Sequence, residues 1–328
     1  MIKLPALATI RQNSSPFKSL LFQDTIMNKT TEKPKGKGLL SQHPFWLGKY
    51  CLLNIIIFAI GSITIIYWDN PFKSVSFWWI LSLIPLFLNR FRFIAGGSIL
   101  LAAIALIYYW TEISWLYLLF LPAAIYIGHL TAVCIHNAVH NNFKPVWINP
   151  VIGELCALQQ ISAGFPVFRL VHNQHHAYSD DPIKDPHPPK GYSFWQFVDN
   201  SRALITNRLT AIYLENWGDS EKSRNTWKIQ TGLLLCMRFA KTLFIFVLLG
   251  PKLFVLLFIP SYLSNVFLFA AFNYFTHIEN KDGTTDILNL DSNLYYAICN
   301  RILFGVFYHK NHHLKPKLFN PMAMQAKN

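Results

Sequence analysis

The sequence predicts an all-α integral membrane protein with about six membrane-spanning or membrane-embedded helices and a histidine-rich helical cap on the cytosolic side. Three observations predict this fold class. The chain of 328 residues is 52% hydrophobic and only 14% charged. Several apolar runs reach the ~20 residues that a helix needs to cross a bilayer. Basic residues gather on one side of these runs, as they do in cytoplasmic loops.

The N-terminal residues 1–47 are polar and basic, with only short apolar patches. They lack an apolar core followed by a cleavage site, so we do not expect a secretory signal peptide. We interpret the segment as a mobile, basic cytosolic tail; an organellar transit segment and a start at Met27 are the alternatives. The net charge of +13 is compatible with nucleic acid or with an anionic membrane surface. The apolar runs favour the membrane, and no nucleic-acid partner is expected.

Six apolar segments follow in order, at residues 50–68, 76–88, 93–110, 113–135, 231–250 and 253–275. The second segment is short and contains Pro85. The first, third and fourth are long enough for ordinary membrane helices. A soluble protein would instead need several long helices that are apolar on all sides and fully buried. A polar stretch, residues 136–230, separates the fourth segment from the fifth.

The distribution of lysine and arginine predicts the orientation in the membrane. With a cytosolic N-terminus, the outer loops fall near residues 69–75, 111–112 and 250–252. Their only basic residues are Lys73 and Lys252. The other side carries the basic tail, the 136–230 loop and the C-terminal lysines. We therefore expect a multi-pass protein with both termini and the 136–230 loop in the cytosol.

Nine of the twelve histidines fall in four short clusters: HNAVH (136–140), HNQHH (172–176), NYFTH (273–277) and HKNHH (309–313). Offsets of three and four place side chains on one face of a helix. The predicted topology puts all four clusters at the cytosolic boundary of the membrane. One such pair is usually an ordinary helix surface, but four on the same side predict a metal site. His43 belongs to no cluster and is interpreted as a tail residue. His129 is expected to find a partner inside the fourth span.

Nine imidazoles exceed the ligand number of one ion, so two ions are expected to share them. Imidazole suits zinc, copper, iron and nickel, and the residues alone do not choose among these. The five cysteines form no CxxC pair, which argues against a structural zinc site. Each imidazole needs an orienting partner on its second nitrogen. Nearby aspartates that offer one, although most are better explained as turn residues, are Asp180, Asp181, Asp185, Asp286 and Asp291.

With these clusters, residues 48–322 resemble the membrane fatty acid desaturase and hydroxylase superfamily. Its pattern is HxxxH or HxxxxH, then two HxxHH boxes, separated by paired spans. The acyl-CoA desaturase branch looks most similar around the second box. There the chain reads Tyr178-Ser179-Asp180 and, with one extra residue, Asp185-Pro186-His187. That branch also has an Asn-x-x-x-His motif, matched by Asn273 and His277. Residues 323–328 form a C-terminal tail.

The resemblance implies a di-iron centre that uses dioxygen to introduce a double bond into a lipid acyl chain. Asn273 would reach one iron directly or through water, and Asp185 and His187 would hold the second box in shape. The iron ligands that the resemblance implies are His136, His140, His172, His175, His176, His277, His309, His312 and His313. We expect no fused cytochrome domain, because HPFW (43–46) lacks the glycines of its haem motif. A separate ferredoxin or small cytochrome would supply electrons.

Other functions remain compatible with the sequence. The first box is HxxxH, as in acyl-lipid desaturases, and the third begins with His309. Related di-iron proteins hydroxylate or ketolate fatty acids, carotenoids or alkanes, and NYFTH also resembles an alkane hydroxylase motif. A non-catalytic metal transporter is a further alternative, but transporters place their ligands near the bilayer midplane. Residues 151–166 are interpreted as an interfacial or re-entrant helix lining a lipid tunnel, or as an amphipathic surface helix.

Overall fold

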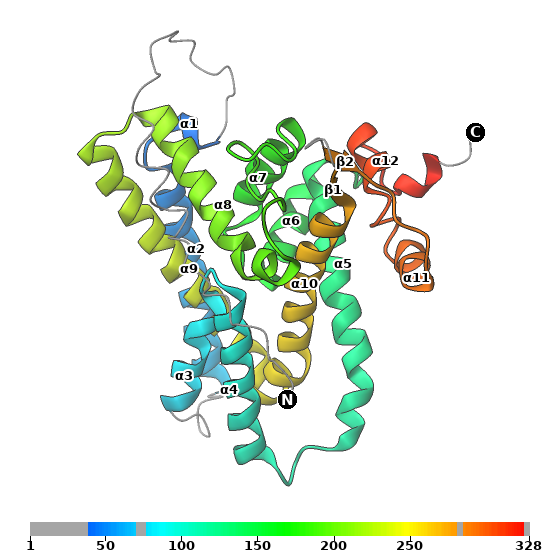
Figure 1. Ribbon diagram of the computed structural model, residues 1–328. Coiled ribbons are helices and arrows are strands. Elements are labelled where there is room, and N and C mark those ends of the chain that lie inside the picture. The colour runs from blue at the N-terminus through cyan, green and yellow to red at the C-terminus, as the bar shows by residue number, and fades with distance from the viewer. Residues whose placement is uncertain (1–38, 70–76, 281–284, 325–328) are drawn as a thin grey trace, which may run out of the picture. The chain divides into compact units, whose positions relative to one another are not determined.

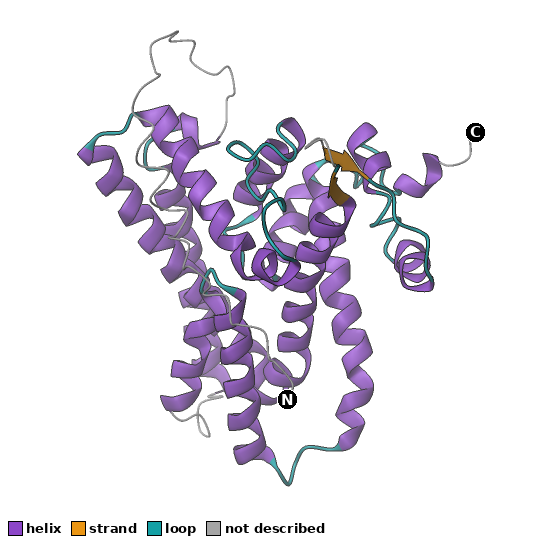
Figure 2. Ribbon diagram, viewed as in Figure 1, coloured by secondary structure: helices purple, strands orange, loops and turns teal. Residues whose placement is uncertain are grey.

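A computed structural model describes residues 39–69, 77–280 and 285–324. The chain divides by its internal contacts into residues 1–36 and 37–328, so every described residue belongs to the second unit. The described residues of this unit are mostly helical (Figure 2). Its one sheet among the described residues is an antiparallel pair of β1 (His277–Glu279) and β2 (Thr285–Ile287), in which His277 faces Ile287. The predicted all-α class is confirmed.

Four helical stretches are long and apolar enough to cross a membrane: Trp46–Asp69, Phe91–Tyr109, Leu116–Val139 and Glu221–Thr276. The first two are α2 (Trp46–Asp69) and α4 (Phe91–Tyr109). The third joins the 3-10 helix η4 (Trp115–Phe120) to α5 (Leu121–Val139). The fourth contains two predicted segments, α9 (Glu221–Leu253) and α10 (Ile259–Thr276), linked by the π-helix η5 (Phe254–Phe258).

The short predicted segment 76–88 forms α3 (Phe77–Leu83) and the 3-10 turn η3 (Ile84–Phe87), which are too short to span a bilayer. Pro85 lies at the start of η3, where its missing N–H costs no helical hydrogen bond. The long stretch breaks at Gly250, whose φ of 69° is a conformation that glycine adopts without strain. Pro251 follows and restarts the helix.

Helices α2 and α4 expose large apolar side chains, including Ile63 (65% exposed), Ile99 (71%) and Ile107 (78%). Contiguous apolar surface of this kind is unfavourable in water and is favourable against lipid. Together with the lengths of the helices, it identifies a membrane protein.

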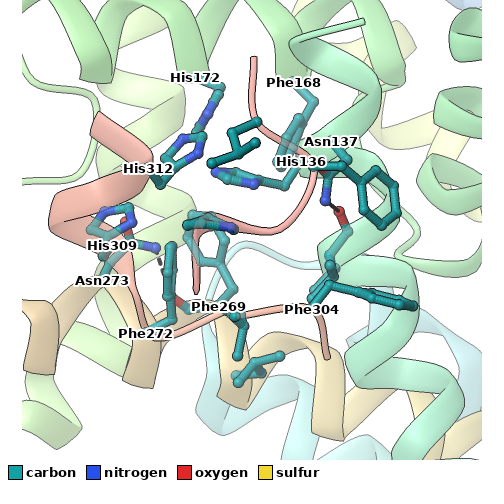
Figure 3. A pocket seen from close by; sticks show the side chains of 18 of the residues that line it. His136, Asn137, Phe168, His172, Phe269, Phe272, Asn273, Phe304, His309 and His312 are labelled. Atoms are coloured by element: carbon teal, nitrogen blue, oxygen red, sulfur yellow. Dashed lines mark hydrogen bonds between the residues drawn. The ribbon is translucent and has the colours of Figure 1, made fainter. Parts of the chain in front are cut away.

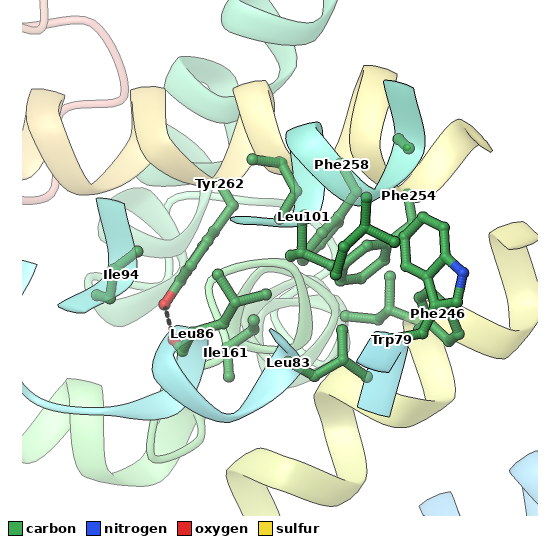
Figure 4. Close-up of a cluster of buried hydrophobic side chains, with 14 of the residues drawn as sticks. Trp79, Leu83, Leu86, Ile94, Leu101, Ile161, Phe246, Phe254, Phe258 and Tyr262 are labelled. Carbon is green, nitrogen blue, oxygen red and sulfur yellow. Dashed lines mark hydrogen bonds between the residues drawn. The ribbon is translucent and has the colours of Figure 1, made fainter. Parts of the chain in front are cut away.

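A buried apolar cluster joins α3, α4, α9 and α10 inside this bundle (Figure 4). Trp79 and Phe246 lie 5.7 Å apart between ring centroids, and Phe254 and Phe258 stack at 5.0 Å. Tyr262 is fully buried, and its hydroxyl donates to the Leu86 carbonyl at 2.7 Å. The cluster thus holds the short α3–η3 helical stretch against the long helices.

Helices α5 and α10 approach each other very closely at Gly128. A Cβ at this position would lie 2.0 Å from the Ser261 carbonyl oxygen. The Asn265 amide donates to the Gly128 carbonyl at 2.9 Å, and the Gln159 amide donates to the Ser261 hydroxyl at 2.9 Å. This packing lays α5 beside α10, so that the histidines at their ends come together.

The remaining helices form the histidine-rich cap. They are α1 (Leu39–Gln42), α6 (Ile148–Gln159), α7 (Phe165–Ala177), α8 (Phe194–Trp217), α11 (Leu294–Ile302), α12 (His309–Leu314) and the 3-10 turn η6 (Pro321–Met324). Figure 1 shows α7, α12 and the β1–β2 pair near the adjoining ends of α5 and α10.

The predicted tails lie mostly outside the described residues, which begin at Leu39 and end at Met324. Within the predicted tail 1–47, Leu40 and Leu47 are buried, and α2 begins at Trp46. The proposed boundaries of the tails and of the domain 48–322 stay predictions.

Candidate metal centre

Four chain segments bring the clustered histidines to one place. His136 lies in the last turn of α5, and His140 is its C-cap residue. The four-residue offset places both side chains on the same face of the helix. Helix α7 carries the second box and α12 the third. The fourth segment is the end of α10, where the chain becomes extended and His277 begins β1.

Five histidines form the first group, in which one ring nitrogen from each lies within 4.8 Å of all the others: His136, His140, His172, His176 and His312. The Nε2 atom of His172 lies 2.9 Å from that of His140 and 3.0 Å from that of His176. His312 Nε2 lies 3.0 Å from His176 Nε2. The rings of His136 and His312 are 4.1 Å apart between centroids.

Four histidines form the second group under the same 4.8 Å limit: His175, His277, His309 and His313. The Nε2 atom of His309 lies 3.0 Å from that of His277 and 3.1 Å from that of His313. His175, His277 and His309 are at most 5% exposed. The structure therefore separates the nine histidines into sets of five and four.

Two aspartates orient the second group. The Nδ1–H of His175 donates to Asp185 at 3.0 Å, and the Nδ1–H of His277 donates to Asp180 at 2.8 Å. A carboxylate on Nδ1 selects the tautomer whose Nε2 lone pair is free for a metal. Asp185 also accepts the backbone N–H groups of Asp180 and His187, at 2.7 and 3.0 Å.

The sequence pattern does not reveal the contact of Asp180 with His277, because Asp180 is one of several aspartates near the histidine boxes. Asp180 adopts a positive φ of 63°, which turns the chain just after the second box. Its partner His277 is 97 residues away. The Ser179-Asp180 pair is typical of a turn, but nothing in the sequence places Asp180 next to His277.

A family model described as fatty acid desaturase matches residues 113–322. The match covers more than half of the chain and includes all four histidine clusters. The chain belongs to the fatty acid desaturase family. The predicted relationship to the membrane desaturase and hydroxylase superfamily is thereby confirmed. Comparison with curated proteins and with solved structures found no match.

The donor set of this family member fits two metal ions. Two imidazole nitrogens bound at right angles to one ion, each at ~2.1 Å, lie about 3.0 Å apart. The Nε2–Nε2 distances of 2.9–3.1 Å in both groups match this spacing. The buried Nε2 atoms of His136 and His175 have no hydrogen-bond partner among the described residues. Such orphaned acceptors are unfavourable unless a cation satisfies them.

Burial favours the neutral form of four of these histidines, His140, His172, His176 and His309, and metal coordination requires that form. Burial, together with the repulsion that neighbouring imidazoles would exert if protonated, lowers the pKa of His176 to about 3. Burial and the charge of Arg169 lower the pKa of His140 to about 4. The pKa values of His172 and His309 are also well below the ordinary value, first because of burial.

The other predicted site residues lie beside the two groups. His187 is 2% exposed, and its ring centroid lies 4.6 Å from that of His175. Asn273 is 2% exposed and donates to the Phe269 carbonyl at 2.7 Å. Of the histidines outside the clusters, His129 pairs through Nδ1 with the Ile125 carbonyl and His43 accepts the Phe45 N–H. The ligand roles of the clustered histidines and of Asn273, and the supporting roles of Asp185 and His187, stay predictions.

An apolar cavity borders the first group of this desaturase-family centre (Figure 3). Figure 3 shows His172, His309 and His312 along one side and Phe304 on the other. A second cavity shares part of the same wall and extends toward the loop after α6. Residues 160 and 162–164 line it, so part of the predicted tunnel segment 151–166 borders a cavity.

Replacement of Asp185 by asparagine is expected to weaken metal binding by about 10–100-fold, because His175 loses the charged acceptor that orients its ring. The measurement is metal content after dialysis against graded chelator concentrations. Asp181→Asn is the matched control, since the Asp181 carboxylate accepts the backbone N–H groups of Ile183 and Lys184 and contacts no histidine among the described residues. Equal metal retention in the two variants would contradict the orienting role.

Proposed function

We propose that the protein is a di-iron, oxygen-dependent fatty acyl desaturase that introduces a double bond into a lipid chain. The observation that carries this proposal is the pair of histidine groups, five and four, beside an apolar cavity. Membership of the fatty acid desaturase family supports it. When bound, iron and dioxygen would supply the oxidising power that no side chain has, and a separate donor would supply two electrons.

The chain's own residues would bind and position the substrate. Phe168, Phe272 and Leu268 line the cavity beside His136 and His172, so an alkyl chain there would meet apolar side chains on one side and the ligand groups on the other. Aromatic walls exclude water and restrict the chain to few positions, which is how a protein selects one C–H bond. Asp180 and Asp185 would hold the imidazoles of the second group in the ligating tautomer.

Hydroxylation is the second candidate, because the same centre oxidises the same kind of C–H bond and the outcome depends on small shifts of the substrate. The test is expression in a desaturase-deficient host, followed by mass spectrometry of total lipids under labelled dioxygen. Loss of two hydrogen atoms from an acyl chain is the expected result. Gain of one labelled oxygen, or oxidation of only a carotenoid or an alkane, would contradict desaturation. The inactive control is His313→Ala.

We further propose that the histidine groups and both termini face the cytosol, where a small ferredoxin or cytochrome would dock against the basic surface. In a Cys236→Ser background, a membrane-impermeant thiol reagent added from outside is expected to label Thr111→Cys but not Lys222→Cys. Both positions are exposed and lie at opposite ends of the predicted spans. The reverse labelling pattern would overturn the orientation.

A further inference from the structure

The second cavity has cationic as well as apolar walls. Arg202 on α8 and Arg238 on α9 both line it, together with His172 and His187 from the metal centre. Apolar side chains, among them Val171 and Phe269, form the wall elsewhere. A cavity with this lining suits a molecule that has one anionic group and an alkyl chain.

The charge of the two arginines is not neutralised within the described part of the chain. Neither guanidinium forms an ion pair with a carboxylate there, and the two groups are close enough to repel each other. Arg238 is 6% exposed, and its Nε has no hydrogen-bond partner among the described residues. A buried charge without a counter-ion is strongly unfavourable, so an anionic ligand would stabilise this arrangement.

The other polar contacts of the two arginines hold the guanidinium groups in place but provide no negative charge. Arg202 donates to the Tyr262 hydroxyl at 2.8 Å and to the Gln160 carbonyl at 3.0 Å. Arg238 donates to Asn89 and, at 3.5 Å, to the Phe87 carbonyl. All of these acceptors are neutral. A third cation, Lys241, is 1% exposed and donates to the Ser162 carbonyl at 3.4 Å.

Glu154, a carboxylate that interacts electrostatically with Lys241, is bound to other partners. Glu154 accepts hydrogen bonds from the Tyr50 hydroxyl at 2.9 Å and from the Phe165 N–H at 3.4 Å. It influences Lys241 electrostatically but is not within ion-pair distance of either arginine. The positive charge at Arg202 and Arg238 therefore exceeds the negative charge that the described residues provide around it.

We propose that Arg202 and Arg238 bind the carboxylate of an unesterified fatty acid, whose alkyl chain runs along the apolar wall toward His172. This inference rests on the proposed function in one respect, because it takes the bound alkyl chain to be that of the acyl substrate. The two cavities adjoin, because Ala132, Phe168, His172, His187 and Phe269 border both. A chain held by its carboxylate in the second cavity would therefore reach the side of the metal centre that the first cavity borders.

The test compares ligands that share one alkyl chain in binding to the purified full-length protein by calorimetry. Hexadecanoate is expected to bind about ten- to hundredfold more tightly than hexadecanol, because only the acid makes charge-assisted hydrogen bonds. Equal affinities in the wild-type protein would overturn the proposal. If hexadecyl phosphate binds more tightly than hexadecanol while hexadecanoate does not, the choice of a carboxylate as the bound group is wrong.

Variants then locate the effect. Arg202→Gln and Arg238→Gln are each expected to abolish the preference for the acid, while Arg238→Lys retains part of it. The matched control is Arg208→Gln, because Arg208 is also a buried arginine with an unpartnered Nε, but it is paired with Glu215 at 2.7 Å. The assignment would be overturned if Arg202→Gln and Arg238→Gln both still bound the acid more tightly than the alcohol. This comparison requires that both variants melt at the same temperature as the Arg208→Gln control.

This experiment is independent of catalysis. A protein that prefers the acid through these arginines but makes no unsaturated product would refute the proposed function and leave the binding site standing. A protein that desaturates chains yet binds acid and alcohol equally would refute the binding site alone.

Discussion

The His313→Ala variant is expected to lose about one of two iron ions per chain and, with it, all measurable desaturation. His313 belongs to the group of four, so its removal leaves three imidazoles for one ion. His312→Ala leaves four of five in the other group and is expected to retain more metal while still losing turnover. Because changes in residues that only orient ligands typically cost 10–100-fold, loss of a ligand is expected to reduce activity by more than about 100-fold. Metal analysis and product mass spectrometry measure the two effects.

The control for this pair is His129→Ala. His129 lies in α5 like His136, but its ring nitrogen pairs with the Ile125 carbonyl and it belongs to neither group. It should keep full metal content and turnover. Full iron and full activity in the His313→Ala protein would show that the second group is not a metal site.

Substitution of Gly128 by alanine is expected to destabilise the protein by about 1–3 kcal/mol or more, because the added methyl group collides with backbone. Its Cβ would lie 2.0 Å from the Ser261 carbonyl oxygen, which cannot move without shifting α10. Since His136 lies in α5 and His277 directly follows α10, we also expect weaker metal retention. The measurement is the unfolding temperature in detergent, with metal content determined on the same sample.

Gly96→Ala is the matched control. Gly96 lies in α4, and a Cβ there meets no atom within 4 Å. Alanine favours a helix over glycine by up to about 1 kcal/mol, so this variant should be at least as stable as the wild type. If Gly128→Ala melts no lower than Gly96→Ala, the close approach of α5 and α10 does not exist in the membrane protein.

Much of the fold could be predicted because hydropathy and helix length are local properties of the chain. The described parts of all six predicted apolar segments are mostly helical, and the weak segment 76–88 contains the short α3–η3 helical stretch. The break between the fifth and sixth segments was marked by Gly250 and Pro251. The way in which the helices pack was not predictable, since close contacts such as Gly128 on Ser261 depend on two surfaces 133 residues apart in sequence.

The sequence by itself determined which histidines gather, because offsets of three and four put them on single helix faces. Only the tertiary structure decided how they divide. Neighbouring residues in the boxes belong to different groups: His175 and His313 to the group of four, His176 and His312 to the group of five. Successive residues on a helix point about 100° apart, so the second and third boxes each contribute histidines to both groups, whereas both histidines of the first box belong to the group of five. Which nitrogens meet, and that Asp180 reaches His277, depends on how α7, α10 and α12 pack across the cap.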